Sequence, residues 1–168
     1  MSIHTGPHPD ESLLAEYAAR PGCHTDCYFA DVAGTVTLAE YIAGFFATPV
    51  FRLERKILGL KRALRTTDAD VARLANGQST RFAAWEVEAR DEQQVLLAVK
   101  NSPIRTWLMA IPTSSGGTRL YFGSAVLARE TTGSDTPKLD PLVRGLMGFH
   151  RLYSRILLAS AKRRVGSV

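Results

Sequence analysis

The chain has 168 residues, of which 45% are hydrophobic, so it can bury one sizeable core and is expected to form a single domain. No apolar run approaches the ~20 residues that a membrane-spanning helix needs, and residues 1–11 are polar rather than basic and then apolar, which argues against a secretory signal. Two cysteines and a formal net charge of +5 indicate no disulfide framework and a mildly basic surface, so we expect a cytoplasmic protein with no membrane span and no nucleic-acid partner.

Residues 1–22 are expected to form an N-terminal arm outside the main domain, which would span residues 23–168. The arm combines scattered His and Pro residues with an apolar stretch, Leu13 to Ala18, that predicts about two helical turns. Alternating apolar and polar residues over 26–33 predict the first strand, and Gly34 ends it.

The next segment has the spacing of helices. Thr37 and Glu40 match a capping box, which predicts a helix beginning there, and the Thr48–Pro49 step interrupts it. Apolar residues then recur at helical spacing over 50–64, and a short third helix is expected over 68–76.

After Gly77 the apolar residues alternate instead of following a helical period. Four antiparallel strands are expected, over residues 83–90, 95–99, 105–111 and 118–128. The clearest hairpin tip is the Ser-Ser-Gly-Gly stretch at 114–117, and a polar loop over 129–139 leads out of the last strand.

A long amphipathic helix is expected over 140–164. Asp140 can accept hydrogen bonds from the first free N–H groups, and Pro141 suits the first helical position. Its broad apolar face favours packing on a sheet, while Gly145 and Gly148 indicate either a close approach or a bend.

This order of elements predicts an α+β fold: an antiparallel sheet of five to seven strands that grips a long C-terminal helix, with helices inserted after the first strand. Three phrases accompany it, TWLM at 106–109, RLYFGSA at 119–125 and FHRLYS at 149–154. The order resembles the helix-grip fold of the START-like (SRPBCC) superfamily, which includes polyketide cyclase/dehydrase-like and lipid-transfer proteins. The phrases are similar to those of bacterial proteins of this kind. The resemblance covers residues 26–164, with five strands where the superfamily usually has six or seven.

The resemblance implies an elongated cavity between the sheet and the closing helix that holds a small apolar or amphipathic molecule. Its expected lining is Trp85, Trp107, Met109, Tyr121, Phe122, Phe149 and Tyr153. The same residue types at strand and helix spacing are also typical of a filled core, and the sequence leaves both interpretations open.

A short cluster beside the first strand has the ligand types of a zinc site. Cys23, His24 and Cys27 lie within one five-residue stretch. A structural zinc site normally takes pairs of ligands from two places in the chain, and the sequence has no second pair, so we expect no metal and no cofactor. The alternative is two reduced cysteines at the edge of the strand.

His150 and Tyr153 are the candidate catalytic pair, because both lie toward the buried side of the closing helix. A cyclase or dehydratase needs a proton-transfer group near neutral pKa and a donor for a developing enolate, and His with Tyr supplies both. The alternative is a histidine whose ring is satisfied by a neighbour or by water, since no matching acid is evident.

Basic residues on the opposite side of the same helix allow a third function, binding to an anionic surface. The stripe consists of Arg144, Arg151, Arg155 and Lys162. A solvated helix face explains it equally simply. The sequence leaves the oligomeric state open, a dimer included.

Overall fold

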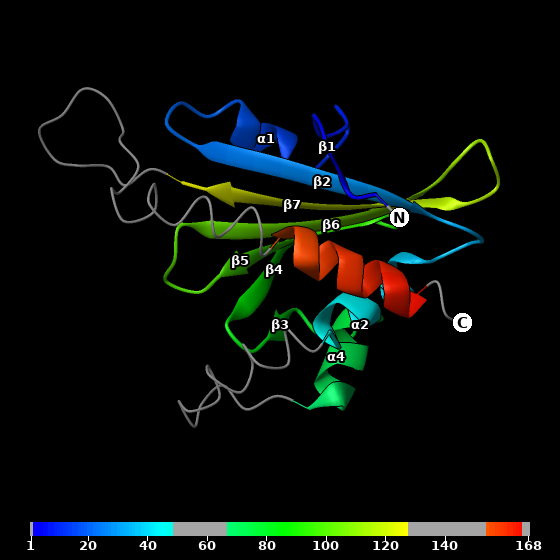
Figure 1. Cartoon of the computed structure of the whole chain (residues 1–168). Coiled ribbons are helices and arrows are strands. Elements are labelled where there is room, and N and C mark those ends of the chain that lie inside the picture. The colour runs from blue at the N-terminus through cyan, green and yellow to red at the C-terminus, as the bar shows by residue number, and fades with distance from the viewer. Residues whose placement is uncertain (1, 49–66, 128–153, 166–168) are drawn as a thin grey trace, which may run out of the picture.

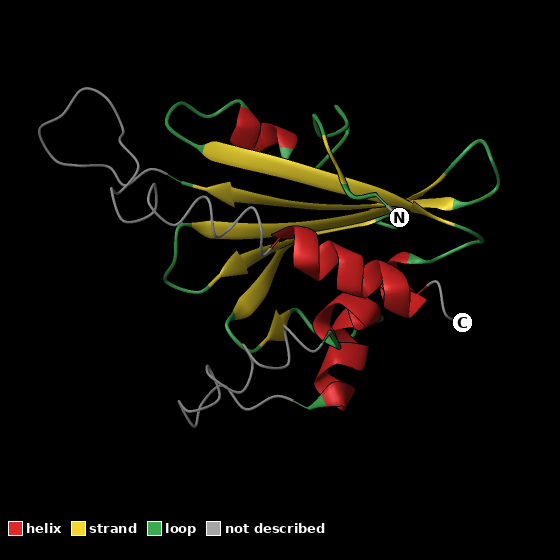
Figure 2. Cartoon of the chain, in the orientation of Figure 1, coloured by secondary structure: helices red, strands yellow, loops and turns green. Residues whose placement is uncertain are grey.

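The computed structural model describes residues 2–48, 67–127 and 154–165, which form a seven-stranded antiparallel sheet with helices on its faces (Figure 1, Figure 2). The strand order is β1-β2-β7-β6-β5-β4-β3. The strands are His4–Thr5 (β1), His24–Val32 (β2), Arg81–Phe82 (β3), Trp85–Arg90 (β4), Gln94–Val99 (β5), Ile104–Pro112 (β6) and Thr118–Val126 (β7). The helices are Ala15–Ala18 (α1), Leu38–Phe46 (α2) and Asp68–Ala75 (α4), and residues 154–165 are also helical. The predicted α+β class is confirmed.

Capping boxes start both α2 and α4. The backbone N–H of Glu40 donates to the Thr37 hydroxyl at 3.2 Å, and the Glu40 carboxylate accepts from the Thr37 N–H at 2.8 Å. Thr67 and Asp70 repeat the arrangement at α4. Since each box satisfies two otherwise free backbone donors, the helix starts are fixed locally.

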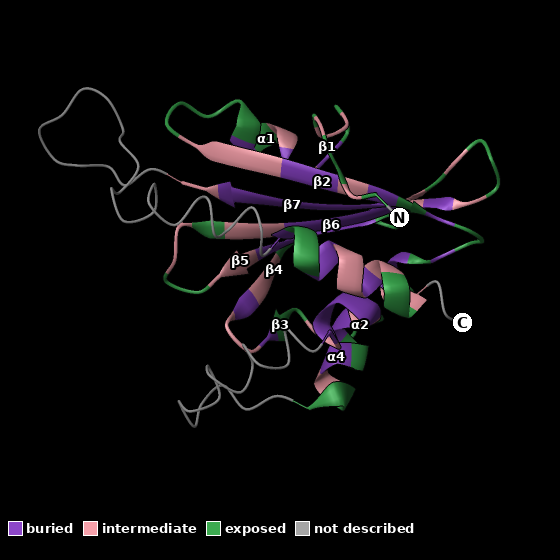
Figure 3. Ribbon diagram, in the orientation of Figure 1, coloured by how far each residue is buried: buried purple, intermediate pink, exposed green. Residues whose placement is uncertain are grey.

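The helices cover the two faces of the sheet unequally (Figure 1, Figure 3). One face carries α2, α4 and residues 154–165, and the core beneath them is called here the helix-facing core; its largest side chains are Tyr28, Tyr41, Phe45, Phe46, Phe82, Trp85 and Phe122. The other face is covered by residues 2–22, called here the arm. Its core, the arm-facing core, contains Leu14, Tyr17, Cys27, Leu96, Trp107, Met109, Tyr121 and Ala125.

Gln94 fastens the arm to the sheet. Its side-chain oxygen accepts from the Leu13 N–H at 2.8 Å and from the Trp107 indole N–H at 2.9 Å. Its amide nitrogen donates to the Glu11 carbonyl at 3.0 Å and to Asp91 at 2.9 Å. Gln94 is only 4% exposed, so a buried amide with all of these partners holds the arm in one register.

A second polar contact holds α1. The Tyr17 hydroxyl donates to Glu88 and accepts from Arg105 Nε at 3.2 Å, while Arg105 pairs with Glu88 at 2.6 Å. Burial, followed by the hydrogen bond to Glu88, raises the pKa of the Tyr17 phenol above its ordinary value. The arm is therefore attached by polar groups at both of its folded points.

A β-bulge changes the direction of side chains in β4. Val87 pairs with Leu97, but Ala89 pairs with Leu96, so one extra residue lies between them. Val87 packs against the helix-facing core and Ala89 against the arm-facing core, although plain alternation predicts the same face for both. The bulge thereby also turns Arg90 toward α4.

The arm is not the loose segment that the sequence predicts. His4 pairs with Phe29 and Thr5 with Tyr28, which makes β1 an edge strand of the sheet, and α1 is a single turn. β1 and β3 are the strands absent from the sequence prediction, and each has only two residues. No helix within the described ranges is long and apolar enough to cross a membrane.

Three other predicted segments lie outside the residues that the structure describes. They are the second helix at 50–64, the loop at 129–139 and the first part of the closing helix up to 153. Residues 154–165 confirm the remainder of that helix, except for a one-residue difference at its end.

Candidate functional site

The residues predicted to line one cavity lie on opposite faces of the sheet. Trp85 and Phe122 belong to the helix-facing core, as predicted. Trp107, Met109 and Tyr121 belong to the arm-facing core, so the prediction that they share a wall with Phe122 is wrong. The reason is strand geometry: consecutive residues in a strand point to opposite sides. Phe149 and Tyr153, together with the candidate catalytic residue His150, lie outside the described residues.

The middle of the helix-facing core is packed with aromatic rings. The ring centroids of Phe45 and Phe122 are 5.3 Å apart, those of Phe45 and Phe46 5.4 Å, and those of Phe46 and Phe82 5.0 Å. All four side chains are at most 3% exposed. In this part of the described structure the space between sheet and helices is a filled core, so a ligand must lie elsewhere along the sheet.

Polar side chains form a row across the same face of the sheet. Asp26 pairs with Ser124, and Ser124 pairs with Thr106. Each lies two residues along its strand from a member of the helix-facing core, so all three point toward the helices. We call Asp26, Thr106 and Ser124 the polar row.

Hydrogen bonds fix the carboxylate of this row. Asp26 Oδ1 accepts from the Ser124 hydroxyl at 2.7 Å and from the Ser124 backbone N–H at 3.0 Å. The Tyr28 hydroxyl lies 3.5 Å from Asp26 Oδ2. Ser124 is only 3% exposed, which places this contact in a sheltered environment. A sheltered carboxylate with a fixed orientation can bind a polar group selectively.

Exposure increases along the helix-facing side of the sheet. On one side of the polar row lie Tyr28 and Phe122, which are buried. On the other side lie Val126, which is partly exposed, and Ile104, which is 39% exposed. The polar row therefore separates the packed core from an accessible apolar rim.

Ser154 adds a polar group from the helix that faces the sheet. It lies three, four and seven residues before Leu157, Leu158 and Ala161, which pack in the helix-facing core, so it lies on the same helix face. Its hydroxyl is fully buried and has no hydrogen-bond partner. Such a group normally has one, and its isolation marks a position where a polar atom would be stabilised.

The zinc-type cluster is split between the faces of β2. Cys27 packs in the arm-facing core, and Cys23 packs against that core. His24 alternates with Cys27 and so points to the other face. Burial raises the pKa of the Cys27 thiol to about 12 and also raises that of Cys23. No group of three metal-binding side chains occurs among the described residues.

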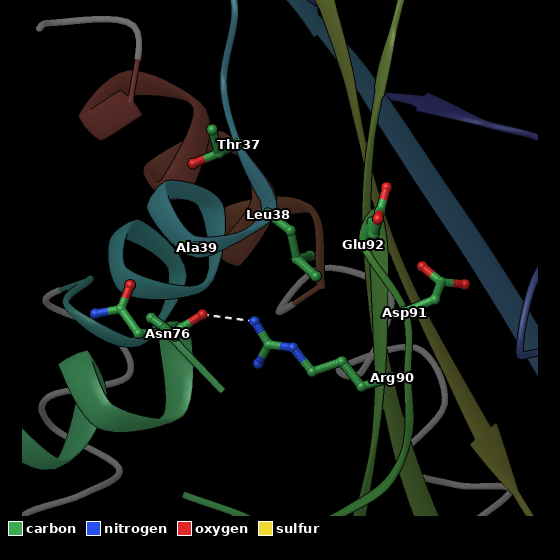
Figure 4. A pocket seen from close by; sticks show the side chains of 8 residues that line it. Thr37, Leu38, Ala39, Asn76, Arg90, Asp91 and Glu92 are labelled. Carbon is green, nitrogen blue, oxygen red and sulfur yellow. Dashed lines mark hydrogen bonds between the residues drawn. The ribbon is translucent and has the colours of Figure 1, made fainter. Parts of the chain in front are cut away.

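A groove of about 570 Å³ lies between α2, α4 and the turn before β5 (Figure 4). Arg90 reaches across it and donates to the carbonyls of Leu74 and Ala75, at 2.7 and 2.6 Å, so it caps the end of α4. Asp91 accepts from the N–H groups of Gln93 and Gln94. Because these polar groups already have structural partners, the groove has the character of a helix junction rather than a binding site.

A second groove of about 590 Å³ lies between α2 and the end of the helical residues 154–165. Small residues line much of it, and a Cβ on Gly44 would lie 2.8 Å from a methyl group of Val165. The glycine thus permits close helix packing. Glu40 borders the groove, but its carboxylate belongs to the capping box.

Two members of the basic stripe lie in the described part of the helix. Arg155 is exposed and Lys162 is half-buried, on the helix side away from Leu157 and Leu158. This arrangement fits a solvated face. Arg144 and Arg151 lie outside the described residues.

No family model matches the chain, and no curated protein matches it. Among solved structures, the crystal structure of Ara h 8.0201 is similar over 88% of this chain and 100% of that chain, with 9% sequence identity and a TM-score of 0.37. A similarity of this size does not establish a family.

Sequence reasoning missed the polar row, although a pattern for it exists. Asp26 alternates in phase with Tyr28, and Ser124 with Phe122. Polar residues at such inward positions on neighbouring strands are the detectable signature. Asp26 was instead grouped with Cys23 and Cys27, its neighbours in sequence.

Proposed function

We propose that the protein binds a small amphipathic molecule between the sheet and the C-terminal helix, with the polar end of the molecule at the polar row. The observation that carries the proposal is the fixed carboxylate of Asp26 beside Ser124 on the helix-facing side. The unpartnered Ser154 hydroxyl in the opposing helix supports it.

The surroundings of the polar row suit a molecule with an apolar body. The packed side of the row leaves no room among the aromatic rings, so the body would extend toward Val126 and Ile104. Burying the accessible part of these side chains would favour binding through the hydrophobic effect. The polar end would then replace water at Asp26 and Thr106.

Catalysis by His150 and Tyr153 remains a prediction from the sequence. The described structure adds one relevant group: Asp26 supplies a carboxylate on the helix-facing side, where the sequence offered no matching acid. Ligand binding is the better supported function because it needs only the described residues.

Native mass spectrometry of the purified full chain tests the proposal. The expected result is an adduct of a few hundred daltons, which is the size of an amphipathic metabolite or lipid fragment, that is depleted in Ser124→Ala. Ser114→Ala, which removes an exposed hydroxyl from the β6–β7 turn, is the matched control and should retain the adduct. An unmodified mass for the wild type, together with no binding of added alkyl probes, would contradict ligand binding.

A further inference from the structure

We infer, on the basis of the proposed function, that the polar end of the ligand is a hydrogen-bond donor, either a hydroxyl or a protonated amine, and that a carboxylate end is disfavoured. The inference concerns the chemical class of the ligand and rests on the atoms that the polar row presents.

The hydrogen bonds of the row leave acceptors facing the ligand. The Ser124 hydroxyl gives its only proton to Asp26 Oδ1, so its oxygen can offer an incoming group nothing but lone pairs. The Asp26 carboxylate accepts and does not donate. The Ser124 backbone N–H is also directed to Asp26, at 3.0 Å. A donor on the ligand therefore matches this pair, and a second acceptor does not.

The distribution of charge supports the same conclusion. The four strands across the row, β2, β5, β6 and β7, carry two arginines between them, and both point to the arm-facing side. There Arg105 pairs with Glu88 and Arg119 with Asp31, each at 2.6 Å. On the helix-facing side these strands present Asp26 without a lysine or arginine, so an anionic ligand end would meet a like charge.

The described helix opposite the row does not reverse this sign. Ser154 is neutral and can donate or accept. Arg155, the next residue, is exposed on the other side of the helix. The donor requirement thus comes from the sheet, and Ser154 could accept a second proton from an ammonium group.

Three ten-carbon probes with different ends test the inference: decanol, decylammonium and decanoate. Titrations of the full chain, followed by two-dimensional NMR of its backbone amides, should show decanol and decylammonium binding at least about tenfold more tightly than decanoate, since a hydrogen bond to a charged group is typically worth that factor. The amides of β2 and β7 around the row should shift most.

Asp26→Asn removes the charge with little change of shape. It should weaken decylammonium binding about tenfold and reduce the preference for decanol over decanoate to within about threefold. Asp31→Asn is the matched control, because it removes a carboxylate from the same strand on the opposite face. It should leave the order of the three probes unchanged.

The outcomes separate the two proposals. If none of the probes binds the wild type, the proposed function fails. If they bind and decanoate is the tightest, or if Asp26→Asn changes no affinity, ligand binding stands and the donor requirement is overturned. Should Asp26→Asn fail to fold, the wild-type order decides together with salt: added salt must weaken decylammonium and leave decanol unchanged.

Discussion

The two faces of the sheet are closed by different means. On the helix-facing side, α2, α4 and residues 154–165 contribute interlocking apolar side chains, with Phe45 and Phe46 at the centre. On the arm-facing side, the fully buried cover is two side chains, Leu14 and Tyr17. There the buried amide of Gln94 and the Tyr17 hydroxyl supply specific polar contacts. A broad face can rely on apolar packing alone, whereas a short cover needs directional bonds to keep its place.

The arm cannot rely on its own secondary structure. α1 has four residues and β1 has two. Isolated helices shorter than about 12 residues are marginal in water, so the arm is ordered by what it touches. We therefore expect it to open at a lower free energy than the helix-facing core, as weakly covered segments generally do.

Phe46→Ala should have the largest effect. Phe46 is fully buried and contacts Phe45, Phe82 and Trp85, so truncation leaves a cavity and should lower the free energy of unfolding by about 3–5 kcal/mol. Urea denaturation followed by circular dichroism measures it. A loss below about 1 kcal/mol would mean that this face is less tightly packed than the ring geometry indicates.

Leu14→Ala should cost about 2–3 kcal/mol and act locally. The Leu14 side chain lies against Gly123, where a Cβ would come within 2.9 Å of a Leu14 methyl group, so truncation opens the arm-facing core at its centre. In a Cys23→Ser background, the rate at which a thiol reagent modifies buried Cys27 reports that opening.

Comparison with Phe46→Ala makes this measurement decisive. Thiol labelling of Cys27 should accelerate more in Leu14→Ala than in Phe46→Ala when both are compared at equal global stability. Equal acceleration would show that the two faces open together and that the arm is no separate unit.

Gln94→Leu should lower the free energy of unfolding by about 2 kcal/mol, because it strands the Leu13 N–H, the Trp107 indole N–H and the Glu11 carbonyl. Hydrogen exchange should show faster exchange at Leu13. Gln93→Leu changes an exposed neighbour and serves as the control. No change at Leu13 would mean that apolar packing alone holds the arm.

Asp31→Asn should have the smallest effect, about 0.2–1 kcal/mol, since its pair with Arg119 is largely exposed. The hydrogen bond from Arg119 lowers the pKa of Asp31, so its folded value lies below its unfolded value. The contribution is therefore present above the unfolded pKa and is lost as the pH falls through the folded one. Denaturation curves of wild type and variant should differ at pH 7 and converge in acid; a difference that persists in acid would rule out this origin.

Local sequence patterns predicted much of the fold. The Thr37–Glu40 capping box, the hairpin tip near Gly116 and the alternation in β6 were all readable, because each depends on residues close together in the chain. β1 was not, since two residues carry no period and its pairing with β2 is set by the arm as a whole.

The candidate site was harder to predict because it depends on which face of each strand is covered by what. Alternation in β7 separates Tyr121 from Phe122, yet it does not reveal that the arm would cover one side. Grouping by aromatic character therefore merged two cores. Asp26 and Ser124 come together only through the β2–β7 register, which sequence alone does not supply.

The bulge in β4 acts as a phase shift in the chain. Before it, Val87 is in phase with the helix-facing side; after it, Arg90 has taken over that phase and reaches the carbonyl of Leu74. A strand of the same composition with one residue fewer would carry this arginine to the other face and leave α4 without its cap. Insertions and deletions in this strand should thus be far less tolerated than substitutions, since one residue of length reverses the direction of every side chain that follows.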